Sequence, residues 1–432
     1  SRVAGMSTRR RVVVTGAGLV APGADGAAGL WENLLAGRSA IGPIRRFDAS
    51  SYPTRIAAEA LAPAGAPASV LGEEFGGRGR IWDFAAEAAS QALSAAGLAP
   101  RGPWAASAGL SLATGMGTYG HAEVFGAAAA GAARGGFDGK AFAEELRLGL
   151  LPHAADRQSP GALAAHLARA AGIGGPLLAS MTACAGGTQA VGDAFRWIRR
   201  GEADVVLAGA SDSEIYPMGL ASFCLLGALS RRNDAPERAS RPFDGARDGF
   251  VLGEGAGFLV LEEREHARAR GADVLAEVAG FGSACDSYRV TDPHPEGLGA
   301  ALAMRRALDD AGLSPDDVDY VNAHGTSTPG GDRVEVRAMK AVFGSRLDGV
   351  AVSSTKSMIG HLTVAAGAVE AIVTALSLRD GRVHPTLNQE LRDPECEIDT
   401  VPEGARRVDL RAALSNSFAF GGQTACLAFV RA

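Results

Sequence analysis

The chain has 432 residues, of which 47% are hydrophobic and 21% are charged. This length and composition are typical of a globular protein with two core-forming halves, and they exclude a disordered or fibrous chain. The formal net charge of −6 makes nucleic acid and anionic membranes poor electrostatic partners.

No apolar run approaches the ~18 residues that a membrane-spanning helix needs, and the first residues lack a secretory signal. The five cysteines are odd in number and include no Cys-x-x-Cys pair, which disfavours a disulfide framework and a zinc site. We therefore expect a cytoplasmic protein without a bound metal, in contact with neither nucleic acid nor membrane. Each cysteine is by default a small buried hydrophobic residue.

The first predicted strand covers residues 11–15 and leads into Gly16-Ala-Gly18-Leu-Val-Ala21. This spacing matches the dinucleotide-binding fingerprint, whose glycines let the backbone approach a pyrophosphate. The acidic residue that should follow about 20 positions later is missing, since residues 35–46 contain none. We interpret the glycines as a tight turn after the strand, which disfavours a nicotinamide oxidoreductase and predicts no bound cofactor.

Apolar residues at helical spacing predict a helix over residues 81–96, and the Ala- and Gly-rich segment 126–136 is interpreted as a surface loop. A unit of strand, short loop, long helix and strand then occurs twice. The first copy comprises residues 177–180, 184–200 and 203–208, and the second comprises residues 350–354, 361–379 and 383–385. The repeat predicts two α/β halves, residues 7–268 and residues 269–432, with the seam between residues 261 and 275.

Cys184 lies where the predicted strand 177–180 gives way to a helix. Backbone N–H groups of a first helical turn are unpaired and carry partial positive charge, which lowers the pKa of a nearby thiol. Gly186 and Gly187 remove side chains that would block an acyl group. A cysteine between alanines and glycines would serve equally well as a packing residue, so this position alone makes Cys184 a candidate and no more.

Two of the eight histidines lie at the ends of predicted strands, in loops rich in Gly, Ser and Thr. His324 follows the strand 320–323, and His361 closes the loop that contains Lys356. We predict surface or structural roles for the remaining histidines, which are His121, His153, His166, His266, His294 and His384.

One cysteine with these histidines fits two chemistries. A cysteine, one histidine and a carboxylate make a protease or an acyl hydrolase. A cysteine and two histidines place two N–H donors on one developing oxyanion, which suits the enolate left when a malonyl thioester loses CO2. The residue types leave both chemistries open.

Four motifs, in this order along the chain, closely resemble the elongating β-ketoacyl-acyl-carrier-protein synthases. They are Thr182-Ala-Cys184-Ala-Gly186, His324-Gly-Thr-Ser-Thr-Pro-Gly-Gly-Asp-Arg-Val-Glu335, Ser354-Thr-Lys356-Ser-Met-Ile-Gly-His361 and Ser415-Asn-Ser-Phe-Ala-Phe420-Gly-Gly422. The similarity is greatest to the type II fatty-acid and polyketide enzymes and extends from residue 11 to residue 429, through residues 240–244 and 247–257. It implies a thiolase-like five-layer αβαβα fold with two pseudo-repeated halves, usually in a dimer.

The resemblance implies a condensing acyltransferase, a 3-oxoacyl-[acyl-carrier-protein] synthase, that needs no cofactor of its own. An acyl chain would pass from the phosphopantetheine arm of an acyl carrier protein to Cys184. Malonyl-carrier protein would then lose CO2, and its enolate would attack the Cys184 thioester. The other subunit of the dimer would be a second copy or a ketosynthase-like chain-length factor.

The resemblance also assigns roles to individual residues. The backbone N–H groups of Cys184 and Phe420 would form the oxyanion hole, while His324 and His361 would hold the malonyl thioester. Lys356 and Glu335 would pair with each other and orient His361. Thr326 and Thr328 would bind the pantetheine arm, although a capping role at the following helix would explain this pair equally. The gate of the acyl pocket would consist of Ala419, Phe420, Gly421 and Gly422.

Three departures from the family pattern concern the substrate. Ala419 stands where glycine is usual, and it carries a cost if the position needs a positive φ. Gln423 follows the paired glycines, a choice more familiar in secondary-metabolite synthases. Arg289 is an unusual residue in a loop that the resemblance places beside the gate.

A fourth departure concerns the partner. Gly227 occupies a position that is often basic in the family and contacts the carrier protein. Carrier proteins are acidic, and opposite charges steer docking. We expect four arginines to take over this role, namely Arg78, Arg80, Arg231 and Arg232.

Two alternatives from related proteins are weaker. A chain-length-factor subunit lacks the catalytic cysteine, so Cys184 argues against it. A degradative thiolase-like acyltransferase would act on coenzyme A and would need a second catalytic cysteine near the C-terminus. Cys426 lies in the apolar stretch 425–429, which is a poor environment for a base.

Overall fold

The computed structural model describes residues 9–61, 71, 78–115, 121–132, 136–149 and 159–432. Within these residues, eleven strands form one mixed sheet in the order β11-β10-β14-β15-β9-β1-β8-β7-β5-β6, with β2 (Ala24–Asp25) paired to β1. The sheet divides into two halves, each built from one part of the chain.

The first half-sheet contains β1 (Val12–Ala21), β5 (Gly109–Thr114), β6 (Leu177–Ser180), β7 (Val205–Ser213) and β8 (Glu254–Glu263). Its long helices are α2 (Arg80–Ala95), α6 (Pro160–Ala171) and α7 (Gly186–Arg200). Strands β6, β5 and β7 are parallel, and β8 runs antiparallel to both β7 and β1.

The second half-sheet repeats this pattern with β9 (Ala276–Cys285), β10 (Tyr320–Asn322), β11 (Ala351–Ser353), β14 (Ala412–Phe418) and β15 (Gln423–Val430). Its long helices are α10 (Leu298–Ala311), α11 (Pro329–Phe343) and α13 (Ala366–Asp380). Strands β11, β10 and β14 are parallel, and β15 runs antiparallel to both β14 and β9. The predicted pseudo-repeat is confirmed, and the antiparallel pairing of β1 with β9 joins the halves. The division at residues 268 and 269 stays a prediction.

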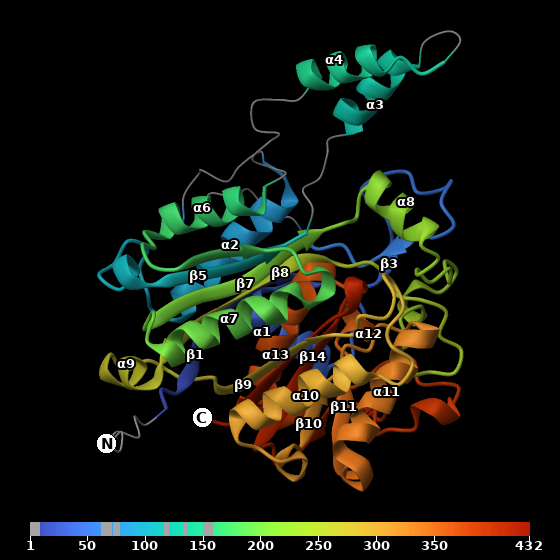
Figure 1. Cartoon of the computed structure of the whole chain (residues 1–432). Helices are drawn as coiled ribbons and strands as arrows, with labels where there is room; N and C mark the ends of the chain where they lie inside the picture. Colours follow the sequence, from blue (N-terminus) through green and yellow to red (C-terminus); the bar gives the residue numbers. More distant parts are fainter. Residues whose placement is uncertain (1–8, 62–70, 72–77, 116–120, 133–135, 150–158) are drawn as a thin grey trace.

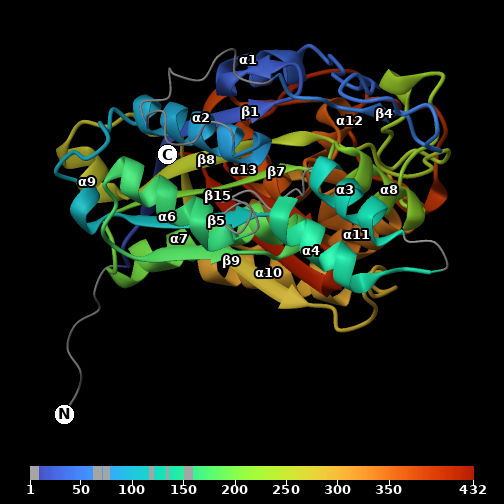
Figure 2. The ribbon, with the colours of Figure 1, turned by 90° about the horizontal axis from the view of Figure 1, so that it is seen from above.

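The helices and half-sheets stack in five layers (Figures 1 and 2). Helices α2 and α6 cover the outer face of the first half-sheet, and α10 and α11 cover the outer face of the second. Between the half-sheets, α7 and α13 lie side by side and contact strands of both. Every residue of α13 from Ala366 to Leu378 is buried. The predicted α/β, five-layer fold is therefore confirmed.

Shorter elements surround the layers. They are α1 (Gly26–Leu35), α8 (Pro217–Leu225), α9 (Arg264–Ala269), α12 (Lys356–Ile359) and the paired short strands β3 (Gly42–Pro43) with β4 (Ile56–Ala57) and β12 (Arg382–Val383) with β13 (Arg406–Arg407). Helices α3 (His121–Gly131) and α4 (Gly139–Gly149) pack on each other and stand apart from the layers in Figure 1. Among the described residues, no helix is long and apolar enough to cross a membrane.

Three sequence-based expectations about elements are wrong. Residues 126–131, predicted as a loop, belong to α3, because alanine favours helix more than the interspersed glycines disfavour it. The closing strand of the second repeat is β14 and not residues 383–385, of which only Val383 is in a strand, the short β12. The two central helices begin at Gly186 and Ala366, because Cys184 lies in the turn before α7, and His361 precedes the turn Thr363–Ala365 before α13.

The Gly16-x-Gly18 motif lies inside β1 and does not form a turn. A Cβ atom at Gly16 or Gly18 would collide with the backbone of α2, which crosses the strand at this point. Gly280 and Gly282 of β9 are equivalent, because a Cβ atom there would collide with the backbone of α10. The glycines thus let one outer helix approach each half-sheet closely, and the nucleotide-binding interpretation loses its structural basis.

Substitution of Gly18 by Ala should destabilise the protein by about 1–3 kcal/mol, because the added methyl group meets backbone atoms that have no freedom to move. Gly29→Ala is the matched control. Gly29 lies in α1 with no atom near its Cβ position, so alanine there should stabilise the protein by up to about 1 kcal/mol. Urea denaturation measures both changes, and an equal stability of the two variants would contradict the close approach of α2.

Candidate active site

Cys184 sits in a single 3-10 turn, Ala183–Ala185, between the end of β6 and the start of α7. Ala183 takes a left-handed conformation with φ of 47°, which is strained for a residue with a side chain. The second half has the same left-handed residue in the turn before α13, where Thr363 has φ of 48° in Thr363–Ala365. The strained turn aims the Cys184 sulfur away from its own half and toward the second.

The second half supplies the two histidines. His361 Nε2 lies 3.1 Å from Cys184 Sγ. The ring of His324 faces that of His361 edge-on, with 5.3 Å between centroids and 85° between planes. Phe250 packs against the His361 ring and Phe418 against the His324 ring. The three predicted reacting residues are thus brought together, although they are distant in sequence.

Both histidines are held in the neutral form. Burial lowers the pKa of His361 well below its ordinary value, and the nearby Lys356 ammonium lowers it further. The pKa of His324 is lowered in the same way by burial, by Lys356 and by His361. Neither Nδ1 atom has a hydrogen-bond partner among the described residues, so no neighbour there fixes either tautomer. Each neutral imidazole can therefore accept a proton at Nε2 in the tautomer protonated at Nδ1, and donate a hydrogen bond from Nε2 in the other tautomer.

Burial also has the largest effect on the pKa of the Cys184 thiol. It raises the pKa of Cys184 to about 12, with a smaller increase from the Asp212 carboxylate. Lys356 and the backbone N–H groups of Cys184 and Phe420 oppose this shift without cancelling it. The sequence-based expectation of a lowered pKa is wrong, because desolvation of the thiolate raises the pKa by more than the unpaired N–H groups at the start of the helix lower it. The resting site therefore contains a neutral thiol beside a neutral imidazole.

Lys356 does not pair with Glu335, as the sequence led us to expect. Its Nζ forms a buried ion pair with Glu370 of α13, and both side chains are 2% exposed. Glu370 is the only charged residue between Ala366 and Leu378 of this buried helix. That isolation is the signal that sequence reasoning missed, because a lone acid in a buried apolar helix requires a cationic partner. Burial raises the pKa of Glu370 to about 7, against the opposing effect of Lys356.

Glu335 instead supports His324 through the backbone. Its carboxylate accepts hydrogen bonds from the N–H groups of His324 (2.8 Å) and Gly325 (2.7 Å). A third bond comes from Asn416 Nδ2 at 3.3 Å. Glu335 therefore fixes the strand end from which the His324 side chain projects, and it does not orient His361.

A cavity of about 300 Å³ leads to Cys184. His324, His361 and Phe420 line its inner part, and Thr326 and Thr328 line its wall. The two threonine hydroxyls lie 3.0 Å apart, and Thr328 also caps α11 by accepting from Gly331 N. Both interpretations of the threonine pair are thus compatible, since Thr328 caps a helix and also borders the cavity.

The predicted gate lies at the inner end of this cavity. Gly421 and Gly422 have φ of 80° and 76°, a conformation that favours glycine, whereas Ala419 has φ of −127°. Alanine in place of the usual glycine at 419 therefore costs nothing in this conformation. The loop that contains Arg289 does touch the gate, because Gly421 N donates to Val290 O at 2.6 Å. The Arg289 side chain points outward and pairs with Asp292.

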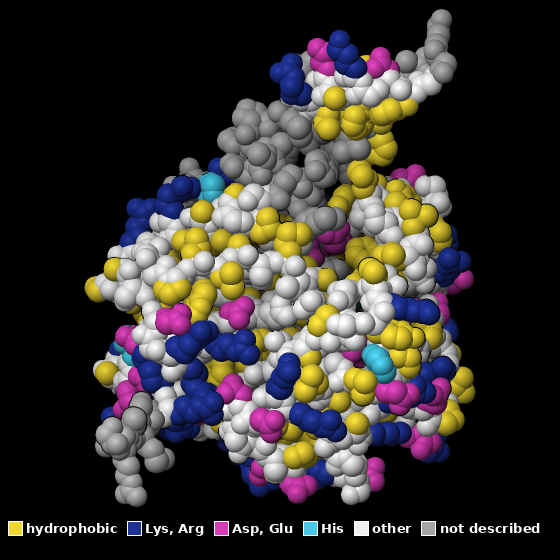
Figure 3. Space-filling view, viewed as in Figure 1, with side chains coloured by type: hydrophobic (Ala, Val, Ile, Leu, Met, Phe, Trp, Pro, Cys, Tyr) yellow, Lys and Arg dark blue, Asp and Glu magenta, His cyan; other side chains and the backbone are white. Residues whose placement is uncertain are grey.

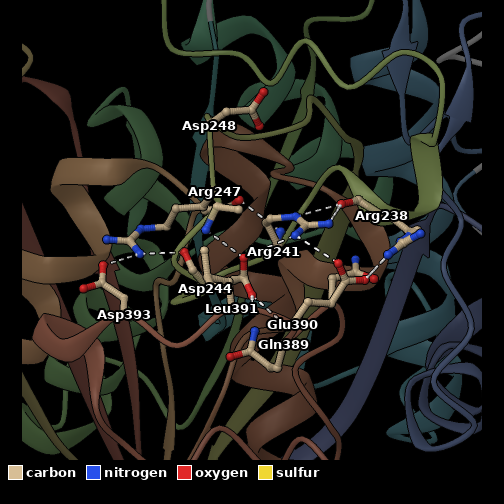
Figure 4. Close-up of polar contacts among 12 residues, drawn as sticks. Arg238, Arg241, Asp244, Arg247, Asp248, Gln389, Glu390, Leu391 and Asp393 are labelled. Atoms are coloured by element: carbon tan, nitrogen blue, oxygen red, sulfur yellow. Dashed lines mark hydrogen bonds and ion pairs between the residues drawn. The ribbon is translucent and has the colours of Figure 1, made fainter.

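Arg241 and Arg247, which lie close to the threonine loop of the cavity, form buried ion pairs with neighbouring carboxylates (Figure 4). Arg247 donates to the carbonyl oxygens of Thr328 (3.1 Å) and Pro329 (3.0 Å), and it pairs with Asp393 at 2.8 Å. Arg241 is buried beside it and pairs with Asp244 at 3.2 Å. The motif around residues 240–248 therefore has a structural role, which is to hold the threonine loop in place.

The four predicted docking arginines do not form one patch. Arg80 is mostly buried in an ion pair with Glu254, and the Arg78 guanidinium lies over the Trp82 ring. Arg232 faces Asp248 at 3.7 Å. Of the four, Arg231 has an exposed side chain with no ion pair among the described residues. The predicted docking role is therefore wrong for Arg80, and it stays a prediction for Arg78, Arg231 and Arg232.

Four of the histidines predicted to be surface or structural have defined partners. His166 Nδ1 lies 2.8 Å from the carbonyl oxygen of Ala162, and His294 Nδ1 accepts from Glu296 N at 3.1 Å. His384 is fully buried among the hydroxyl groups of Tyr320, Ser353 and Thr355, and burial lowers its pKa to about 4. His266 contacts the buried Glu262 at 2.8 Å. His153 lies outside the described residues.

Comparison with known proteins agrees with this geometry. Residues 9–267 match the family described as "Beta-ketoacyl synthase, N-terminal domain", and residues 275–390 match "Beta-ketoacyl synthase, C-terminal domain". The chain is 40% identical to "3-oxoacyl-[acyl-carrier-protein] synthase 2" of Coxiella burnetii over 98% of this chain and 99% of that protein. It is 41% identical to the protein of the same name from Synechocystis, over 98% of each chain.

Solved structures with the same fold include ketosynthases from polyketide systems. A type II polyketide ketosynthase in complex with its acyl-carrier protein superposes with a TM-score of 0.85 at 32% identity, over 98% of this chain and all of that one. The ishigamide ketosynthase/chain length factor gives 0.84 at 32% identity, with the same coverage. A β-ketoacyl synthase from Burkholderia phymatum gives 0.84 at 34% identity, also with the same coverage.

The raised pKa of Cys184 predicts a distinctive pH dependence of alkylation. Because the thiolate fraction grows as the pH approaches the pKa, iodoacetamide should modify Cys184 about tenfold faster per pH unit from about pH 7 to pH 9. Mass spectrometry of the Cys184 peptide measures the rate at each pH. A plateau below about pH 8 would instead indicate a thiolate already formed at neutral pH.

The buried ion pair between Lys356 and Glu370 predicts an effect on the stability of the protein. Glu370→Gln leaves the Lys356 ammonium buried without its counter-charge and should destabilise the protein by about 3–5 kcal/mol. The double variant Lys356→Met/Glu370→Gln removes both charges and should recover part of this loss. Urea denaturation of the three proteins measures the difference. A double variant less stable than Glu370→Gln alone would contradict the pairing.

Proposed function

Since the chain belongs to the β-ketoacyl synthase family, we propose that Cys184, His324 and His361 carry out its decarboxylative condensation. The enzyme is a condensing acyltransferase that forms a 3-oxoacyl thioester in fatty-acid or polyketide biosynthesis. The observation that carries the residue assignment is the 3.1 Å contact between Cys184 Sγ and His361 Nε2, with His324 beside it at the inner end of the cavity.

The first step transfers an acyl group to Cys184. As the sulfur attacks the acyl thioester carbonyl carbon, the thiol proton passes to His361 Nε2, which the low pKa of this histidine leaves free to accept it. The backbone N–H groups of Cys184 and Phe420, which face the sulfur, hold the oxyanion of the tetrahedral intermediate. The intermediate expels the phosphopantetheine thiolate, which takes the proton from His361 and leaves as a thiol.

The second step forms the enolate. The malonyl thioester breaks the bond between its carboxylate carbon and its methylene carbon and releases CO2. The electron pair of that bond becomes the carbon–carbon double bond of the enolate, and the π pair of the thioester carbonyl moves onto its oxygen. His361 now takes the tautomer protonated at Nε2, which no described neighbour of Nδ1 prevents. The Nε2 donors of His324 and His361 stabilise the charge on the oxygen, and the buried setting strengthens each hydrogen bond.

The third step joins the two carbon chains. The enolate carbon attacks the carbonyl carbon of the acyl-Cys184 thioester, and the same two backbone N–H groups hold the new oxyanion. The intermediate collapses by breaking the carbon–sulfur bond to Cys184. The released thiolate takes up one proton from solvent, which balances the overall consumption of one proton for each CO2 released.

The substrates are delivered by a carrier protein, and the enzyme works as a dimer. Support for the carrier protein comes from the similarity to a ketosynthase in complex with its acyl-carrier protein. Support for the dimer comes from β6, which forms an edge of the sheet with Leu177 exposed, and from Phe125 and Phe137, which are exposed on the part of the chain around α3 and α4. The second subunit is another copy or a chain-length factor. In either pair this chain is the catalytic subunit, because it has Cys184.

The division of labour predicts that Cys184→Gln, whose amide resembles an acylated thiol, keeps malonyl decarboxylation and loses condensation. His361→Ala should reduce CO2 release by at least about 100-fold, because an oxyanion donor is lost. Release of labelled CO2 from malonyl-carrier protein and formation of the 3-oxoacyl product measure the two steps separately. Loss of both activities in Cys184→Gln would contradict the assignment of decarboxylation to the histidines.

A further inference from the structure

Asp212 lies near the end of β7 in the first half, and its side chain contacts the turn before α13 in the second half. Its Oδ2 atom accepts hydrogen bonds from the hydroxyl group of Thr363 and, at 3.1 Å, from Val364 N. Its Oδ1 atom accepts from Ser213 N at 2.9 Å. The side chain is buried, with 1% of the residue exposed. Three donors, two of them from the other half, thus hold one buried carboxylate.

The turn that Asp212 contacts follows His361 closely. Thr363, two residues after His361, has the left-handed φ of 48°, which is strained for a β-branched residue and persists only where the surroundings fix it. The backbone of His361 is itself held, because its N–H donates to Val251 O at 2.7 Å and its carbonyl oxygen accepts from Gly253 N at 2.9 Å. The first half therefore holds the His361 segment at two points, and Asp212 is the side chain that holds the second.

The fold leaves room for this carboxylate beside β5. Gly115 directly follows β5, the strand that pairs with β7, and a Cβ atom at Gly115 would collide with Asp212 Oδ1. The φ of Gly115 is outside the left-handed region, so its backbone conformation does not require glycine. Glycine at this position is needed for space alone, because any side chain would displace the Asp212 carboxylate.

Asp212 also carries the negative charge of this region. Burial raises its pKa to about 6, while its three hydrogen bonds lower the pKa. Burial and the Asp212 charge raise the pKa of Glu214 to about 8, although the Tyr216 hydroxyl donates to Glu214. A Cβ atom at Gly219 would lie 3.0 Å from Glu214 Oε2, so this carboxyl group packs against α8, and Figure 3 shows hydrophobic side chains around the hollow beside that helix. At neutral pH the charge of the pair therefore lies on Asp212.

We propose that Asp212 is a positioning residue for the condensation, which holds the turn after His361 and so keeps His361 Nε2 in contact with the Cys184 sulfur. This inference rests on the proposed role of His361 as the acceptor of the thiol proton. Proton transfer requires the two heavy atoms to lie within hydrogen-bond distance, so a small displacement of the turn removes the 3.1 Å contact. Asp212 acts through Thr363 and Val364, and the first half thus fixes the base that the second half supplies.

Asp212→Asn tests the hydrogen bonds to the turn. An amide has one accepting oxygen, so asparagine cannot accept from both Ser213 N and Val364 N, which bond to different oxygens of the carboxylate. Transfer of an acyl group from acyl-carrier protein to Cys184 should become about 10–100-fold slower, because a displaced base accepts the thiol proton poorly. Rapid quenching and mass spectrometry of the Cys184 peptide measure this rate.

Alkylation of Cys184 by iodoacetamide separates positioning of the base from general damage to the site. This reaction proceeds through the thiolate and needs no enzyme base. In Asp212→Asn it should be as fast as in the wild type or faster, because removal of a nearby negative charge favours the thiolate. A fall of alkylation in parallel with acyl transfer would overturn the proposal.

Two variants of Thr363 test the same contact without a change of charge. Valine keeps the branched shape but lacks the hydroxyl group, and serine keeps the hydroxyl group. Thr363→Val should slow acyl transfer at least about threefold with unchanged alkylation, because one hydrogen bond to Asp212 is lost. Thr363→Ser should recover most of that rate. If Asp212→Asn does not fold, this pair decides alone, and equal acyl-transfer rates in the two variants would overturn the proposal.

Glu262→Gln is the matched control for loss of a buried carboxylate. Glu262 of β8 is fully buried and accepts from Thr15 and Arg270, and the pairing of β8 with β7 places it at the opposite end of the strands from Asp212. This variant should be less stable in urea, yet the folded protein should transfer the acyl group at the wild-type rate. Slowing of acyl transfer in Glu262→Gln as large as in Asp212→Asn would contradict the positioning role.

The same measurements distinguish failure of this inference from failure of the proposed condensation. A wild-type enzyme that forms the Cys184 adduct no faster than Asp212→Asn and Thr363→Val would overturn the positioning role alone. A wild-type enzyme that forms no adduct on Cys184 would instead count against the condensation itself.

Discussion

The close contact between α7 and α13 is the constraint on which the active site depends. A Cβ atom at Gly187 would lie 2.5 Å from the backbone nitrogen of Ala368, and one at Gly367 would collide with Thr188. Each glycine thus occupies the second position after the strained turn of its own half, and each lets the other helix approach. The turn before α7, which holds Cys184, and the turn before α13, which follows His361, are therefore fixed relative to each other. Their relative position sets the distance from Cys184 Sγ to His361 Nε2. The glycines beside Cys184 serve this packing rather than access for an acyl group.

The same burial that fixes the geometry also sets the charges. Desolvation raises the pKa of the Cys184 thiol and lowers that of both histidines, so the resting site holds neutral groups. Lys356 is the nearby cation, and Glu370 neutralises it from inside α13. A site of this kind has little charge to attract a substrate, but it strengthens every hydrogen bond to an oxyanion that forms within it. This suits a reaction whose three steps all develop negative charge on oxygen.

The sequence predicted that Cys184, His324 and His361 come together, because each lies near a strand end within a recognisable motif. It failed for Lys356, whose partner depends on which acid the fold brings nearby, and Glu370 lies inside an apolar helix far from any motif. The Gly16-x-Gly18 pair was misinterpreted because a turn and a close helix–strand contact both need a missing side chain. The docking prediction was wrong for Arg80 for a similar reason, since its buried ion pair with Glu254 is a property of the folded chain. The pseudo-repeat was visible, but its last strand follows a connection of about thirty residues that hides it.

The central claim is that the thiol of the first half and the histidines of the second act on one substrate pair. Incubation of the wild-type enzyme with an acyl-carrier protein, followed by malonyl-carrier protein, tests it by mass spectrometry of the Cys184 peptide. The account predicts an acyl adduct on Cys184 that disappears on addition of malonyl-carrier protein, with one CO2 and one 3-oxoacyl product for each adduct lost. An adduct on another cysteine, or one that persists while CO2 is released, would contradict it.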